Sequence, residues 1–139
     1  MNTHEQYIKL ETAKLAKQAG FDWSVIKYYF VEDNGATGFC EGWNGPDDWN
    51  YYKPHLGERF SAPTQSVLRR WLREEKMVHI EIITGMGLYV VWFTDCGKKR
   101  LLIENHKEAT FNTYEDALEA GLQKCLTLIM KSEKLIVKS

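Results

Sequence analysis

The sequence has few cysteines, no long hydrophobic run and almost no net charge. Its three cysteines, Cys40, Cys96 and Cys125, are widely spaced and form no CxxC pair, so we expect reduced structural thiols. The longest apolar stretches, 88–93 and 126–130, are too short to cross a bilayer. The N-terminus lacks a basic region followed by an apolar run, and this absence predicts a cytoplasmic location and no membrane partner.

The net charge of −1 argues against a protein that mainly coats phosphate backbones or acidic membranes. The charge is nevertheless uneven along the chain. Residues 1–60 carry 6 Lys/Arg and 9 Asp/Glu, whereas residues 61–139 carry 12 and 10. Any basic patch is therefore expected in the second part and should be local.

The chain length of 139 residues, with 44% hydrophobic and 27% charged residues, is typical of one globular domain. A helix is expected over 5–19, where apolar residues recur at helical spacing and Gly20 ends the pattern. The aromatic run 27–31 predicts a strand, Asn34-Gly35 a hairpin turn, and 37–40 the returning strand.

The second part of the chain has a more regular pattern. Ser61 is the expected N-cap of a helix over 62–76, with Pro63 in its first turn. Strands are expected at 78–83, 88–94 and 100–104, followed by a helix that Thr113 caps. The tail 135–137 is expected to add an edge strand or to fray. Together the elements predict a single α+β domain over 1–139, with an antiparallel sheet (N-terminal hairpin plus three-stranded meander) packed against about three helices.

A long irregular loop at about 41–60 is the most unusual feature. It combines aromatic and acidic residues, and the candidate binding residues are Trp43, Asp47, Asp48, Trp49, Tyr51 and Tyr52. Exposed Trp and Tyr side chains can anchor a protein or stack on a sugar, and carboxylates repel phosphate. The alternative is that Trp43 and Trp49 fold inward and fix the loop to the core.

The middle helix carries a basic face made by Arg69, Arg73 and Lys76, which could contact nucleic acid. Glu74 and Glu75 dilute its charge, and no second helix stands a short turn upstream. A solvated face with internal ion pairs is therefore the competing interpretation.

No motif for metal binding or catalysis is present. Asp47, Asp48 and His55 share a loop, but no His/Cys pair has zinc spacing. The pairs Cys40 with His55 and Cys96 with His106 lack any local signature of a nucleophile. The sequence thus predicts no catalytic residue, no metal and no cofactor, and it favours a protein that is not an enzyme.

Two stretches resemble a family of small uncharacterised proteins from phages and mobile elements of Bacteroidetes. They are the segment from Ser61 to Glu74, SAPTQSVLRRWLRE, and the segment from Thr113 to Leu122, TYEDALEAGL. The resemblance covers roughly residues 10–130 and implies a phage or prophage context, without a catalytic residue. The last third is also similar in layout to HicB-type antitoxins, which would imply a protein partner.

Three functional hypotheses follow. The first is a non-enzymatic phage or mobile-element accessory protein that binds another protein through the aromatic loop. The second is a nucleic-acid-binding module that uses the basic face of helix 62–76. The third is a small enzyme or sugar-binding module centred on 39–55. The partner, the substrate and the oligomeric state stay open.

Overall fold

The structure is a computed structural model, which describes residues 6–51, 57–85, 88–95, 98–101, 110–111 and 113–138. Three helices and seven strands follow one another along these residues. They are α1 (Leu10–Gln18), β1 (Lys27–Val31), β2 (Thr37–Glu41), β3 (Glu58–Ser61), α2 (Gln65–Glu75), β4 (Val78–Gly85), β5 (Leu88–Asp95), β6 (Lys98–Leu101), β7 (Thr110–Phe111) and α3 (Tyr114–Lys138).

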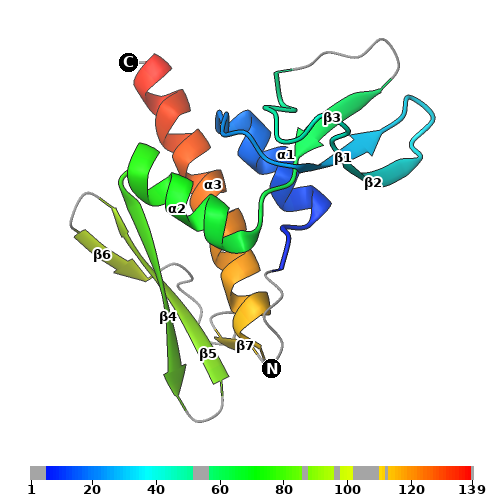
Figure 1. Cartoon of the computed structure of the whole chain (residues 1–139). Helices are drawn as coiled ribbons and strands as arrows, with labels where there is room; N and C mark the ends of the chain where they lie inside the picture. The colour runs from blue at the N-terminus through cyan, green and yellow to red at the C-terminus, as the bar shows by residue number, and fades with distance from the viewer. Residues whose placement is uncertain are drawn as a thin grey trace.

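The strands form two separate antiparallel sheets, on opposite sides of the helices (Figure 1). The first has the order β2-β1-β3, and the second has the order β4-β5-β6 with β7 also paired to β5. The long helix α3 runs between them and contacts α1, α2 and β4. The α+β class and the packing of helices on sheet are thus confirmed, while the hairpin and the meander belong to different sheets.

The core lies where the three helices meet. Leu68, Trp71 and Leu72 of α2 pack with Leu122 and Leu126 of α3, and all five side chains are buried. Burial of large apolar side chains is the main stabilising term for such a domain. Because α1 is short and rich in alanine, its stability depends on this docking.

A buried carboxylate connects the three helices. Glu119 of α3 is only 3% exposed. Its side chain accepts hydrogen bonds from the backbone N–H of Lys9 (2.9 Å), from the hydroxyl of Thr12, and from Nε2 of Gln65 (2.9 Å). Gln123 in turn donates to the Thr12 hydroxyl (2.9 Å). One carboxylate therefore fixes α1 and the start of α2 against α3.

The first helix begins later than its sequence pattern predicts. Residues 6–9 are not helical, and Lys9 has extended backbone angles. Tyr7 forms a β-bridge with Thr64, and the Ile8 N–H donates to the carbonyl of Pro63 (3.1 Å). This pairing buries Ile8 completely. Burial of Ile8 and the two backbone contacts thus favour the extended form over one more helical turn.

The predicted N-cap of the middle helix is wrong by three residues. Thr64 is the N-cap, and its side chain accepts the N–H of Val67, so Pro63 precedes the helix. Ser61 is instead the last residue of β3, fully buried, with its hydroxyl accepting the N–H of Trp49 (3.1 Å). The expected irregular loop at 41–60 therefore ends in a strand, because β3 pairs with β1.

Of the two alternatives expected for 135–137, the edge strand is wrong, since α3 continues to Lys138. No glycine or proline follows Gly121, so nothing in the sequence stops the helix. The strand expected at 100–104 is displaced towards the N-terminus, where β6 covers Lys98–Leu101. The remainder of that expectation, 102–104, lies outside the described residues.

Candidate functional site

The aromatic segment 42–51 is held against the first sheet by Trp49. This side chain is 9% exposed, and its indole N–H donates to the carbonyl of Val25 (2.6 Å). Its ring lies 4.4 Å from the ring of Tyr28, measured between centroids. The guanidinium of Arg59 lies over both rings, at 5.5 and 5.8 Å. Trp49 therefore packs inward, as one of the two sequence-based interpretations predicts.

Backbone and amide contacts fix the same segment on both sides of Trp49. Asp47 and Val25 exchange two backbone hydrogen bonds, each of 3.0 Å. The Asn50 side chain donates to the carbonyl of Phe21 and accepts the N–H of Ser61, both at 2.9 Å. Because these contacts join the segment to two different regions of the chain, its described residues form a defined structure and not a loose loop.

Trp43 points away from this structure and is 100% exposed. It stands in a turn between Gly42 and Gly45, and Gly45 has a φ of +96° that favours glycine. A Cβ at Gly42 would lie 2.5 Å from Cζ2 of Trp49, so the backbone of the turn sits directly on the buried indole. The two tryptophans therefore have opposite roles, because Trp49 supports the turn that displays Trp43.

The same part of the chain carries further exposed aromatic side chains and an excess of acidic residues. Tyr51 is 80% exposed and Phe39 is 47% exposed. Between residues 20 and 51 the chain has six carboxylates and one basic residue, Lys27. The carboxylates are Asp22, Glu32, Asp33, Glu41, Asp47 and Asp48. Tyr52 and His55, two further residues of interest from the sequence, lie outside the described residues.

The two aspartates of the segment contribute to its local structure. The Asp48 carboxylate accepts the N–H of Asn50 (3.2 Å), and the Asp47 carboxylate accepts the N–H of Asp48 (2.8 Å). Burial raises the pKa of Asp48, with a smaller contribution in the same direction from Asp22 and Asp47, while the hydrogen bonds from Asn50 and Tyr51 lower it. The raised pKa of Asp48 is therefore explained by its place in the turn, and it does not by itself indicate a catalytic group.

The basic face of α2 is only partly available to a ligand. Arg69 donates to the hydroxyl of Tyr114 (2.8 Å) and to the carbonyl of Ile80, so it connects α2 with α3 and β4. Lys76 lies over the ring of Trp71, with 5.6 Å from Nζ to the centroid. Arg73 is exposed. The helix therefore presents a smaller basic surface than its sequence indicates.

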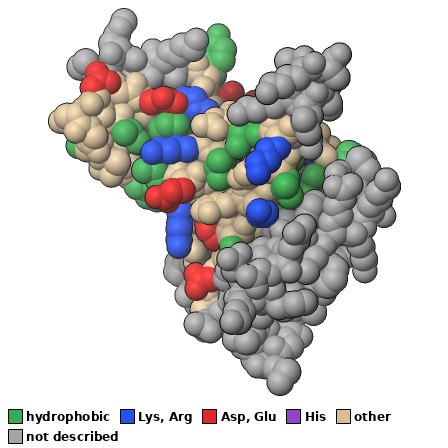
Figure 2. All heavy atoms as spheres, turned by 180° about the vertical axis from the view of Figure 1, so that it is seen from behind, with side chains coloured by type: hydrophobic (Ala, Val, Ile, Leu, Met, Phe, Trp, Pro, Cys, Tyr) green, Lys and Arg blue, Asp and Glu red, His purple; other side chains and the backbone are tan. Residues whose placement is uncertain are grey.

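The described part of the reverse face of the molecule also carries no large patch of only basic or only acidic side chains. Figure 2 shows basic, acidic and hydrophobic side chains interspersed over the described part of that face. Dense binding of phosphates needs several uncompensated cations close together. The nucleic-acid hypothesis stays a prediction that no contact among the described residues favours.

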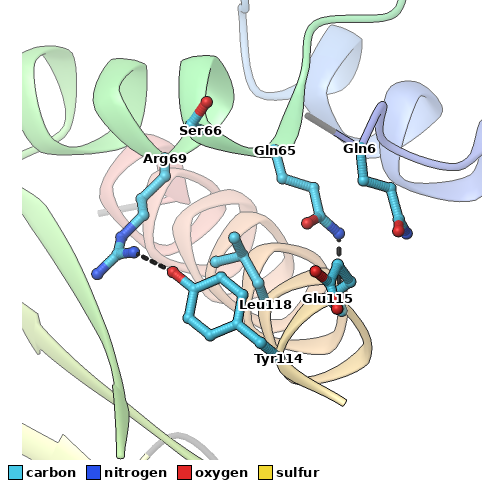
Figure 3. Close-up of a pocket in the computed structure, with 7 residues that line it drawn as sticks. All are labelled: Gln6, Gln65, Ser66, Arg69, Tyr114, Glu115 and Leu118. Atoms are coloured by element: carbon cyan, nitrogen blue, oxygen red, sulfur yellow. Dashed lines mark hydrogen bonds between the residues drawn. The ribbon is translucent and has the colours of Figure 1, made fainter. Parts of the chain in front are cut away.

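A small cleft lies between the N-terminal ends of α2 and α3 (Figure 3). Its volume is about 200 Å³, and it is lined by Gln6, Gln65, Ser66, Arg69, Tyr114, Glu115 and Leu118. Figure 3 shows Arg69 reaching across from α2 to the Tyr114 hydroxyl, and Gln65 directed at Glu115. The cleft is smaller than most small-molecule sites, and its polar groups already bind one another across the helix interface.

The described part of the chain contains no group of three His, Cys, Asp or Glu residues that could hold a metal ion. Cys40 is half-buried and Cys125 is buried. Of the two Cys/His pairs considered from the sequence, His55, Cys96 and His106 lie outside the described residues. None of the helices, as far as they are described, is long and apolar enough to cross a membrane.

Two features of the site were not anticipated from the sequence. One is the support of the turn by Asn50 and Ser61, whose short polar side chains carry no pattern that points to Trp49. The other is that the predicted strand β2 lies at the edge of its sheet with Phe39 exposed in its centre. The glycines at positions 42 and 45, on either side of Trp43, are the signal that could have indicated a turn with an exposed tryptophan.

Comparison of the chain with protein-family models, with curated proteins and with solved structures finds no match. The interpretation of the site therefore rests on its own geometry.

Proposed function

We propose that this protein is a non-enzymatic binding protein, which recognises another protein through the surface formed by Trp43 and the exposed residues around it. The observation that carries this proposal is the complete exposure of Trp43 on a turn that the buried Trp49 supports. Ordering a loop costs conformational entropy. An ordered loop that leaves a tryptophan side chain fully in water is typical of an interaction site.

The excess of carboxylates in the part of the chain that carries Trp43 supports a partner with a basic contact surface. Six carboxylates and one lysine occupy residues 20–51. The face of an exposed indole attracts Lys and Arg, and nearby carboxylates add to that attraction. A cytoplasmic protein of a phage or mobile element is the setting that we propose, and only the resemblance of 61–74 and 113–122 supports this setting.

The experiment is a comparison of three tagged proteins, each used to capture partners from an extract of the native host. They are the wild type, Trp43→Ala and Met77→Ala. Met77 is 66% exposed between α2 and β4, so its variant removes an exposed apolar side chain from another surface. We expect the wild type and Met77→Ala to retain the same partner, and Trp43→Ala to lose it. Equal retention by all three proteins would refute the role of Trp43.

A further inference from the structure

The strand β2 forms one edge of the first sheet, and the backbone groups along this edge point outward. The N–H of Glu32 bonds to the carbonyl of Ala36, and the N–H of Gly42 bonds to that of Ile26. Hydrogen-bonded pairs alternate along an antiparallel ladder. Given the register of β1 and β2, the N–H and C=O groups of Thr37, Phe39 and Glu41 therefore face away from β1.

No hydrogen bond between described residues uses these outward groups of β2. The opposite edge, formed by β3, is different. There the carbonyl of Arg59 accepts from Nζ of Lys17 (3.0 Å), and the N–H of Ser61 donates to the Asn50 side chain (2.9 Å). Side chains of the protein thus cover the outward groups of β3, while no described residue hydrogen-bonds to those of β2.

The sequence of β2 also lacks the usual protection of an edge strand. Proline, lysine and bulges discourage pairing with a foreign strand. The strand TGFCE contains neither proline nor lysine, its residues pair one to one with β1, and its one charged side chain, Glu41, is paired with Lys27 of β1 (3.4 Å). Thr37, Gly38, Phe39 and Glu41 are all exposed. Figure 1 shows the hairpin of β1 and β2 projecting away from the three helices, so this edge is accessible from outside.

We infer that β2 binds an extended, basic segment of the partner protein as an additional antiparallel strand. This inference rests on the proposed function and specifies how the partner is held. Phe39 would face an apolar side chain of the added strand, while Glu41 and Trp43 at the end of β2 would face Lys or Arg. Backbone hydrogen bonds supply affinity in this mode of recognition, and alternate side chains supply specificity.

The charge distribution favours this occupant over a second copy of the chain. Pairing two β2 edges would bring two regions together that each carry six carboxylates and one lysine. Repulsion between like charges disfavours such a dimer at low ionic strength. A basic segment gains from the same charges.

The inference is tested with a short blocked peptide, Lys-Thr-Val-Thr-Val-Thr-Lys, titrated into isotope-labelled protein and followed by NMR. Its sequence reads the same in both directions, so either direction of binding presents valines and lysines on one face. We expect the amides of Thr37, Phe39 and Glu41 to exchange with solvent roughly tenfold more slowly at saturation. Methylating the valine amides, which would face β2, should weaken binding by about tenfold or more.

Three controls separate the explanations. Methylating the threonine amides of the peptide, which would point away from β2, should leave binding unchanged. Replacing both lysines by glutamate should abolish it. In the protein, Thr37→Pro removes one outward N–H without breaking the ladder to β1, and it should weaken binding where Thr37→Ala does not. Circular dichroism checks that both variants are folded.

The outcomes distinguish strand addition from the role of Trp43. If the peptide binds without protecting the β2 amides, and both methylated peptides bind equally, strand addition is refuted whether or not Trp43→Ala loses binding. If protection persists in Trp43→Ala, strand addition stands and the anchoring role of Trp43 fails. Protection that appears without peptide and grows with protein concentration would identify a second copy as the occupant and would overturn the inference. An absence of any binding at millimolar peptide would also overturn it.

Discussion

Replacing Glu119 by glutamine is expected to destabilise the fold by about 2–4 kcal/mol. The carboxylate is 3% exposed, and it accepts from the Lys9 N–H, the Thr12 hydroxyl and the Gln65 amide. A glutamine side chain has one acceptor oxygen and one NH₂ group. Whichever way it is placed, the NH₂ group faces a donor that the carboxylate had satisfied.

The magnitude follows from the bonds that are lost. A hydrogen bond to a charged acceptor contributes about 1.5–3 kcal/mol, and a buried donor left without a partner costs about 1–3 kcal/mol. Removing a buried charge offsets part of this loss, because the desolvation of the carboxylate no longer opposes folding. Rotation of the Gln65 amide would not repair the contact, since its NH₂ group also donates to the Glu115 carbonyl (3.0 Å).

Urea denaturation, followed by circular dichroism and by tryptophan fluorescence, measures the effect. The matched control is Glu75→Gln, which makes the same chemical change at an exposed position near the end of α2 and should alter stability by less than about 0.5 kcal/mol. Coincident transitions in the two signals would support two-state analysis. A loss in Glu119→Gln no larger than that in Glu75→Gln would refute the role of this carboxylate in joining the helices.

Three further predictions concern the first sheet and its loop. Trp43→Ala should change the free energy of unfolding by less than about 0.5 kcal/mol, because the side chain is fully exposed. Trp49→Ala should lower it by about 3–5 kcal/mol, because the side chain is buried. Similar losses for the two variants in urea denaturation would contradict the opposite roles of the two tryptophans. Gly35→Ala should cost about 1 kcal/mol, because Gly35 has a φ of +92° but an added Cβ would meet no other atom. Gly57→Ala should cost at least about 2 kcal/mol, because the added Cβ would also overlap the carbonyl oxygen of Val31 in β1. Equal costs for the two variants would argue against this overlap. Because the fold raises the pKa of Asp48, the native state holds this proton to higher pH than the unfolded state does. The free energy of unfolding therefore falls as the pH rises from the unfolded-state pKa of Asp48 to its native-state pKa. Asp48→Asn should remove that loss, which denaturation between pH 4 and pH 7 would detect as a flatter profile, and an unchanged slope would count against the raised pKa.

Local patterns predicted the elements whose signals are local. The Asn34-Gly35 pair marked the hairpin of β1 and β2, but the pairing of Val31 with Thr37 and the hydrogen bond from the Glu32 N–H to Ala36 close a three-residue loop, 33–35, in which Gly35 alone has a positive φ. The start of α3 at Tyr114 follows the cap at Thr113, whose hydroxyl accepts the N–H of Asp116 (3.1 Å). These elements form from residues that are neighbours in the sequence, so tertiary contacts had little reason to alter them.

Long-range pairing explains the predictions that were wrong. The strand β3 has no alternating pattern of its own and exists because β1 supplies a partner. Ser61 has the chemistry of an N-cap, but it stands opposite Tyr28 in the sheet, its N–H donates to the Asn50 side chain, and its hydroxyl accepts the N–H of Trp49. Arg69 belongs to a basic face by helical spacing, yet the neighbouring strand and helix supply acceptors that the sequence of α2 does not reveal.

The sequence by itself determined the α+β class, the acidic and aromatic character of the first part, and the region in which a binding surface was to be sought. Only the tertiary structure decided which aromatic residues of that region are exposed. Trp43 and Trp49 lie in one short segment with similar neighbours, and their sequence context does not distinguish them. The distinction arises because Val25 and Ser61, distant in the chain, provide an acceptor for the indole and another for the backbone of Trp49. Burying one indole there leaves the other exposed on the turn above it.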